Sequence, residues 1–210
     1  MQFLTNGAVW RANRLPIYSE QVKTAFKEWA IVVDALGSGE QIVILRKGGI
    51  SEGRGGFQVE HPEFLLFPTW FHQQRESVLP HAQHRYDVIA VEFPAAEKLR
   101  LELFARVAEW RRLDSLADAE RLRGQHIWRD EVIADRFDWG RAKNIFAIAV
   151  RVFRLPSAVE LPLSPAYGGC KSWVELEHDI DVGGVTPVLD DPVFASQLAR
   201  FTTALEKVVQ

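Results

Sequence analysis

The segment from Ile145 to Phe153 limits the fold most, because its residues are apolar on both faces of an extended strand. Such a strand must be covered on both sides, which predicts a central position in a sheet. Its uninterrupted apolar run, Ile145 to Val150, is six residues long, far short of the ~20 residues that cross a bilayer. Arg151 would project from this strand and must either pair with a carboxylate such as Glu92 or Asp87 or reach a binding site. Arg154 lies on the opposite face at the end of the strand and is a candidate ligand-binding residue.

Size and charge narrow the class of protein. The chain has 210 residues, of which 47% are hydrophobic, and this favours one domain with one sizeable core. Its net charge of −3 supplies no overall attraction to nucleic acids or membranes, so a nucleic-acid site must be local. The single cysteine, Cys170, excludes an internal disulfide and fits a reducing compartment. The first twenty residues contain no apolar stretch typical of a secretory signal, so we expect a cytoplasmic protein without membrane association.

Residue patterns predict a mixture of strands and helices. A short helix is expected to begin at Ser19. Trp29 to Leu36 and Gln41 to Arg46 are rich in β-branched residues and predict a hairpin across a glycine-containing loop. Further strands are predicted at residues 57–60, 64–67 and 86–93, and after a glycine turn within residues 167–177. The apolar spacing of Leu99, Leu103, Val107 and Trp110 predicts a central helix that begins near Pro94.

The C-terminal segment predicts an amphipathic helix. Asp191 serves as its cap and Pro192 occupies its first turn. Its apolar stripe consists of Phe194, Leu198, Phe201, Leu205 and Val208. We expect this stripe to dock on the core, although it would also suit a homodimer interface. The fold class predicted from all segments is α+β, a single mixed domain with a mainly antiparallel sheet, central helices and a C-terminal amphipathic helix.

Several motifs occur in a fixed order along the chain. They are Lys27-Glu28-Trp29, Leu45-Arg46-Lys47-Gly48-Gly49-Ile50, Phe64-Leu65-Leu66-Phe67-Pro68-Thr69, His72-Gln73, and Tyr167-Gly168-Gly169-Cys170-Lys171-Ser172-Trp173-Val174-Glu175-Leu176. From about Lys27 to Leu176 the chain resembles the domain of unknown function 1802 family. The resemblance implies a family-like core at 27–176, with an N-terminal extension at 1–26 and a C-terminal tail at 177–210. It implies no established activity, only a suggested association with restriction-modification systems.

The first candidate site is Arg46-Lys47-Gly48-Gly49. Two cations at a strand end, followed by glycines, allow side chains and backbone N–H groups to converge on an anion such as phosphate. The spacing is not that of a P-loop, so nucleoside triphosphate binding is not indicated. The alternative is a structural turn in which Arg46 pairs with a carboxylate.

The second candidate is His72 with Gln73, which follow a predicted strand. The imidazole suits a general base and the amide suits substrate orientation. The alternative is a surface or packing histidine. His81 and His84 add ligand-like spacing, but no carboxylate or cysteine set completes it, so no metal site is predicted.

The third candidate surrounds Cys170. An exposed thiol beside Lys171 could act as a nucleophile, although a lone cysteine is more often a small core residue. Lys171 suits contact with an anion, and Trp173 shares its strand face. Glu175 lies on the same strand face and could hold a catalytic metal together with Glu177. A nuclease therefore remains an alternative function.

Three classes of function remain. The leading hypothesis is binding of an anionic ligand, a nucleotide or nucleic acid, by loops that meet at one sheet edge; it rests on Arg46, Lys47, His72, Gln73 and Lys171. The alternatives are a metal-dependent nuclease or other hydrolase linked to restriction-modification, and a protein-interaction or structural domain. The sequence indicates no cofactor. The leading hypothesis requires residues distant in sequence to gather around a common cleft.

Overall fold

The computed structural model describes residues 20–47, 59–70, 74–93, 97–140 and 142–206. Its strands are β1 (Gln21–Trp29), β2 (Val43–Arg46), β3 (Glu63–Thr69), β4 (Lys98–Leu113), β5 (Ile145–Pro162), β6 (Trp173–Asp181) and β7 (Thr186–Pro187). Its helices are α1 (Ala30–Gly37), α2 (Pro80–Glu92), α3 (Leu116–Glu120), α4 (Asp130–Asp138) and α5 (Asp191–Leu205), with 3₁₀ turns at η1 (Arg75–Ser77) and η2 (Pro165–Tyr167). These elements confirm a single α+β domain.

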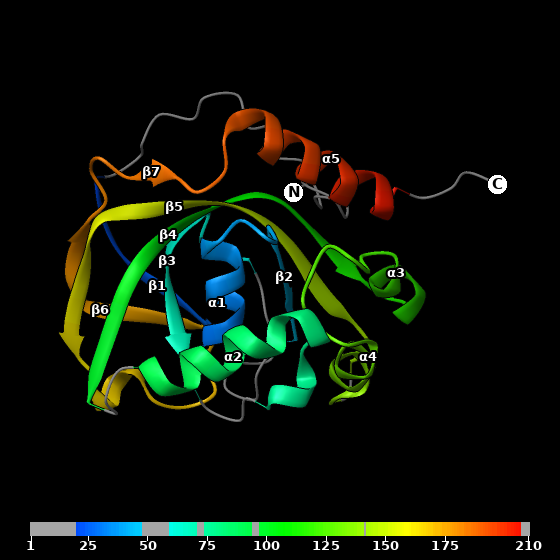
Figure 1. The fold of residues 1–210 in the computed structure, drawn as a ribbon, viewed down its shortest axis with the longest axis horizontal. Helices are drawn as coiled ribbons and strands as arrows, with labels where there is room; N and C mark the ends of the chain where they lie inside the picture. Colours follow the sequence, from blue (N-terminus) through cyan, green and yellow to red (C-terminus); the bar gives the residue numbers. More distant parts are fainter. Residues whose placement is uncertain (1–19, 48–58, 71–73, 94–96, 141, 207–210) are drawn as a thin grey trace, which may run out of the picture.

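The described strands form one seven-stranded mixed sheet in the order β2-β5-β4-β3-β1-β6, with β7 beside β5. Within these strands, β1 and β3 are parallel and the other pairs are antiparallel. The sheet is strongly curved, as Figure 1 shows, and α1 lies within its curve. Long strands with register shifts, such as β4 and β5, favour such coiling. The curvature brings the two edge strands, β2 and β6, toward each other.

The sheet is covered on both faces, so apolar residues alternate between two core clusters. Phe26 and Leu66 belong to the larger cluster, which includes buried residues of α1, of β2 and of the first half of β5. Their neighbours Ala25 and Leu65 belong to the smaller cluster, together with buried residues of β6. Strand β5 lies between β2 and β4, which confirms the central strand predicted from Ile145 to Phe153.

The predicted hairpin before Arg46 was wrong in its first half. Residues Ala30–Gly37 form α1, whose side chains are buried except for the half-buried Asp34. A short run that is apolar on every side suits a buried helix as well as a buried strand, so periodicity could not separate the two. The short helix expected from Ser19 was also wrong, because the described residues there form β1.

The central helix predicted from Pro94 was wrong as well, since residues Lys98–Leu113 form β4. Exposed and buried residues alternate from Lys98 to Leu103, and this period of two is that of a strand. Conversely, the strand predicted at 86–93 lies mostly within helix α2. The strand predicted at 64–67 is confirmed within β3, and the glycine turn within 167–177 leads into β6 as expected. The strand predicted at 57–60 lies partly outside the described residues.

The predicted C-terminal helix is confirmed as α5, with its cap one residue earlier than expected. The carboxylate of Asp190 accepts a hydrogen bond from the N–H of Val193 at 2.8 Å, and Phe194 and Phe201 are buried in the larger core cluster. Asp191 instead pairs with Arg151, whose Nη2 lies 2.7 Å from Oδ1. The partners expected for Arg151, Glu92 and Asp87, were therefore wrong. None of the described helices combines the length and apolar character needed to span a membrane.

Candidate functional site

The two edges of the curved sheet meet at a hydrogen bond between Arg46 and Ser172. Arg46 ends β2 and Ser172 immediately precedes β6; the Nε of Arg46 donates to Oγ of Ser172 at 2.8 Å. Lys27 of β1 contacts the same segment, because its backbone N–H donates to the carbonyl of Ser172 at 2.9 Å and its Nζ donates to the carbonyl of Gly169 at 3.1 Å. Segment 169–172 is therefore held against both β1 and β2, and the charges of Lys171 and Arg46 both lie close enough to act on Lys27.

Aromatic rings support this junction from the core side. The guanidinium of Arg46 lies 5.4 Å from the ring centroid of Phe26. The Phe26 ring in turn packs against Trp173 at 4.7 Å and Phe64 at 5.4 Å. The ammonium of Lys27 lies 5.9 Å from the ring of Phe67. Packed rings restrict the motion of both cations, so their positions are set before any ligand arrives.

Lys27, Arg46 and Lys171 form what we call the cationic cluster. Partial burial is the main cause that lowers the pKa of Lys27, and the positive charges of Arg46 and Lys171 lower it further, against an opposing effect of Cys170. Across the part of the chain that the structure describes, no carboxylate forms an ion pair with any of the three. The cluster therefore concentrates positive charge without a paired counter-charge.

Arg136 of α4 extends this positive region into the core. Its guanidinium lies 3.9 Å from the ring centroid of Trp128, and its Nη1 donates to the carbonyl of Leu45 at 3.0 Å. Burial lowers the pKa of Arg136 to about 10; nearby Glu28 opposes the shift and Arg46 adds to it. Glu28 is only 2% exposed and accepts the N–H of Trp29 at 2.8 Å.

Sequence reasoning assigned no role to Glu28 or Arg136. The sequence could have pointed to Glu28, because this charged residue lies between the apolar Phe26 and an apolar segment that follows it. A carboxylate in such surroundings needs a positive partner or hydrogen-bond donors. Arg136 carried no comparable signal, because its contact with Leu45 depends on how α4 packs.

Two other predicted ligand-binding cations have backbone partners instead. The ammonium of Lys47 donates to the carbonyls of Phe137 at 3.1 Å and Asn144 at 2.8 Å, and also to that of Ala142. A cation near the carbonyls that end a helix is stabilising, here at the end of α4. Arg154 similarly donates from Nη2 to the carbonyl of Gly37, at the end of α1, at 2.9 Å. Both residues hold helices against the sheet.

The remaining candidates are spread over the surface or lie outside the described residues. Cys170 is exposed next to Lys171. Glu175 is also exposed and pairs with Lys23 at 3.1 Å. Within the described ranges, no group of three His, Cys, Asp or Glu side chains could hold a metal ion. Gly48, Gly49, His72 and Gln73 lie outside the described residues.

The chain matches a protein-family model and is similar to several solved structures. No curated protein matches it significantly. Among solved structures it is similar to ASCH from Zymomonas mobilis, with 11% identity, coverage of 84% of this chain and 92% of that one, and a TM-score of 0.41. Two point variants of that protein give TM-scores of 0.43 and 0.39 at 11% and 12% identity, each over 84% of this chain and over 93% and 95% of theirs.

The family model described as "Domain of unknown function (DUF1802)" matches residues 25–200. This range includes all three residues of the cationic cluster and most of α5. The chain therefore belongs to the DUF1802 family.

Proposed function

We propose that this chain binds a phosphate-bearing ligand, a nucleotide or a nucleic acid, through the cationic cluster. The observation that carries the proposal is the 2.8 Å bond between Arg46 and Ser172, which unites loops 126 residues apart in sequence. Positively charged side chains repel one another, so their gathering without paired carboxylates has an electrostatic cost in the free protein. An anionic ligand would remove that cost.

The orientation of Arg46 supports the same proposal. Its Nε is occupied by Ser172, whereas neither Nη group has a hydrogen-bond partner among the described residues. A guanidinium held in this way presents a planar pair of donors that matches two phosphate oxygens. Lys27 and Lys171 would add point charges beside it. Three cations suit a phosphate or polyphosphate better than a single carboxylate.

The other residues predicted to bind a ligand differ in whether the proposal includes them. Gly48, Gly49, His72 and Gln73 lie outside the described residues, and we propose them as ligand contacts from the sequence alone. Trp173 supports the site by packing against Phe26. Lys47 and Arg154 are left out, because their donors already bind backbone carbonyls. Glu175 pairs with Lys23, so the described carboxylates give the nuclease alternative no specific support.

Fluorescence anisotropy with short labelled single-stranded DNA and RNA, competed by unlabelled mononucleotides, tests the proposal on the full chain. Three phosphate contacts predict a slope of log affinity against log salt of about −2 for a single strand. A triple variant, Lys27→Gln, Arg46→Gln and Lys171→Gln, should abolish binding.

The matched control changes Lys98, Arg100 and Arg112 to glutamine. It removes the same charge, but these cations pair with Glu160, Glu102 and Asp114 outside the cluster. We expect the control to retain affinity. Equal losses in both triple variants, or no binding to any of these ligands at low salt, would refute the proposal.

A further inference from the structure

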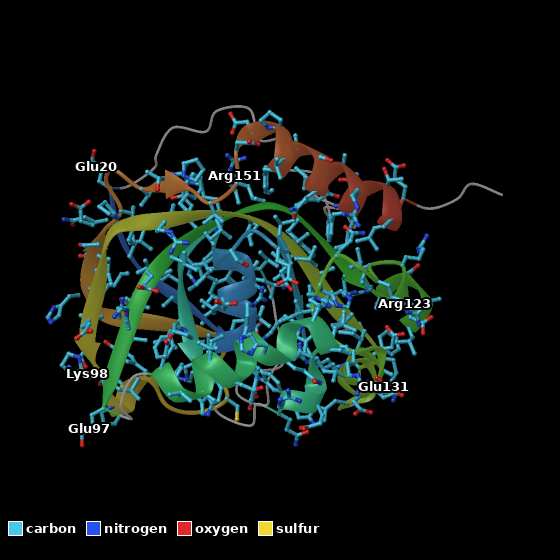
Figure 2. All side chains as sticks on the ribbon, viewed as in Figure 1. Glu20, Glu97, Lys98, Arg123, Glu131 and Arg151 are labelled. Atoms are coloured by element: carbon cyan, nitrogen blue, oxygen red, sulfur yellow. The ribbon has the colours of Figure 1, made fainter. Side chains whose placement is uncertain are left out.

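A cavity of about 290 Å³ lies apart from the cationic cluster, between the start of α2 and the start of α4. Leu79 and Trp128 form its apolar wall. Arg123 and Glu131, which line the cavity, are labelled in Figure 2 near α3 and α4. Its volume is near the lower limit for sites that enclose a small molecule.

His126 supplies this cavity with a fixed hydrogen-bond donor. The residue is only 6% exposed, and its Nδ1 accepts the N–H of Trp128 at 3.2 Å. A ring nitrogen that accepts carries no proton, so the neutral imidazole must carry its proton on Nε2. Burial is the main cause that lowers the pKa of His126 to about 4, which keeps the ring neutral at pH 7. His126 is one of the residues that line the cavity, and no described residue accepts a hydrogen bond from Nε2.

The first turn of α4 adds further donors. Its N-cap, Arg129, forms no side-chain cap hydrogen bond. The N–H groups of Val132 and Ile133 donate to the carbonyl of Arg129, but those of Asp130 and Glu131 donate to no described residue. Unpaired N–H groups at a helix start attract anions.

The charged side chains around the cavity leave room for a negative ligand. Arg123 pairs with the carboxylate of Asp130 at 2.8 Å and with that of Glu120 at 3.1 Å, so two carboxylates share its charge. Arg129 is exposed and forms no ion pair with the residues described, so its positive charge is available. Glu131, together with the two carboxylates that share Arg123, would oppose an anion.

We infer that this cavity binds a small molecule with an oxyanion, a carboxylate or a phosphate, attached to a flat apolar group. The oxyanion accepts from Nε2 of His126 and from the N–H groups that begin α4. The flat group rests against Leu79 and Trp128. This site is independent of the phosphate-binding cluster proposed above.

NMR titration of the isotope-labelled full chain tests the inference with benzoate, phenyl phosphate and benzamide. Benzamide has the shape of benzoate without its charge. We expect benzoate or phenyl phosphate to give saturable shifts of the His126 Nε2–H and of the Asp130 and Glu131 amides, and the stronger of the two identifies the oxyanion. Benzamide should bind at least about tenfold more weakly. Equal binding of benzamide, or no saturable shift with either anion, overturns the inference.

Three variants locate the site. His126→Asn leaves an acceptor for the Trp128 N–H but removes the Nε2 donor, so anion affinity should fall about tenfold. Arg129→Gln should weaken binding severalfold and Glu131→Gln should strengthen it severalfold, because they remove opposite charges. These two exposed positions keep the test decisive if His126→Asn does not fold. Unchanged affinity in both overturns the inference, whereas Arg46→Gln should leave anion binding in the cavity intact.

Discussion

Arg46 and Arg106 occupy similar surroundings on the same sheet but have different partners. Each guanidinium lies over an aromatic ring, 5.4 Å from Phe26 for Arg46 and 5.4 Å from Phe104 for Arg106. Arg106 binds the carboxylate of Glu63 at 2.7 Å, whereas Arg46 binds the uncharged hydroxyl of Ser172 at 2.8 Å. A carboxylate partner neutralises the charge of the arginine within the protein. A hydroxyl partner orients the guanidinium but leaves its charge available to a ligand.

The comparison implies that a buried titratable side chain with neither kind of partner should stay uncharged. His126 is such a residue. Its folded pKa of about 4 lies below the usual 6.5, so the unfolded chain takes up the proton first as pH falls. The free energy of unfolding should therefore decrease between pH 6.5 and 4, by up to about 3 kcal/mol. Urea denaturation across this range should show the loss, and His126→Asn should flatten the profile. An equal slope in the variant would contradict the assignment to His126.

A carboxylate partner should make an arginine important for stability. Arg106→Met leaves Glu63 with an uncompensated charge, whose side chain is only 15% exposed. We expect a loss of about 2 kcal/mol in the free energy of unfolding, below the range for fully buried pairs because some water reaches the site. Chemical denaturation measures it. The double variant with Glu63→Gln should recover part of the loss, and the absence of any recovery would show that the pair is unimportant.

A hydroxyl partner should make an arginine important for binding instead. Arg46→Met removes a charge that has no carboxylate partner among the described residues, so the free energy of unfolding should change by less than about 1 kcal/mol. Thermal denaturation with and without oligonucleotide provides the check, because ligand should raise the melting temperature of the wild type and not of the variant. A destabilisation as large as that of Arg106→Met would erase the distinction between the two arginines.

The smallest expected effect is that of salt on the stability of the free protein. Screening the repulsion among Lys27, Arg46 and Lys171 should stabilise the free protein by a few tenths of a kcal/mol. Denaturation at low and moderate ionic strength, compared between the wild type and Lys27→Gln, isolates this contribution. Phosphate and sulfate should be avoided as the salt, because they would bind rather than screen. If the free energy of unfolding depends on salt equally in the wild type and in Lys27→Gln, the salt effect does not come from the cationic cluster.

The predictions of secondary structure from sequence failed where the residue pattern did not separate a helix from a strand. Residues 30–36 are apolar except for the half-buried Asp34, and their position inside the curved sheet decides that they form a helix. The stripe from Leu99 to Trp110 matched a helical spacing, but the alternation of charged residues with Leu99, Leu101 and Leu103 belongs to a strand that pairs along much of β5. Pairing over so many residues stabilises a strand through contacts that lie far away in sequence.

The candidate site was predicted in part. Arg46 and Lys171 were selected from their positions beside glycines, and the structure brings them together with Lys27. Lys47 had an equally suitable position beside glycines, and Arg154 was selected at the end of the apolar strand, yet their donors serve the ends of helices α4 and α1. The difference depends on which carbonyls lie within reach, and local sequence carries no information on that.

By itself, the sequence determined the α+β class, the central apolar strand, the C-terminal helix with a proline in its first turn, and the family motifs. These features follow from local residue types and their spacing. The tertiary structure alone decided that the two sheet edges meet at Arg46 and Ser172, and which cations lack a paired carboxylate. The reason is physical: pairing of charges depends on distances between residues more than a hundred positions apart, and sheet curvature sets those distances.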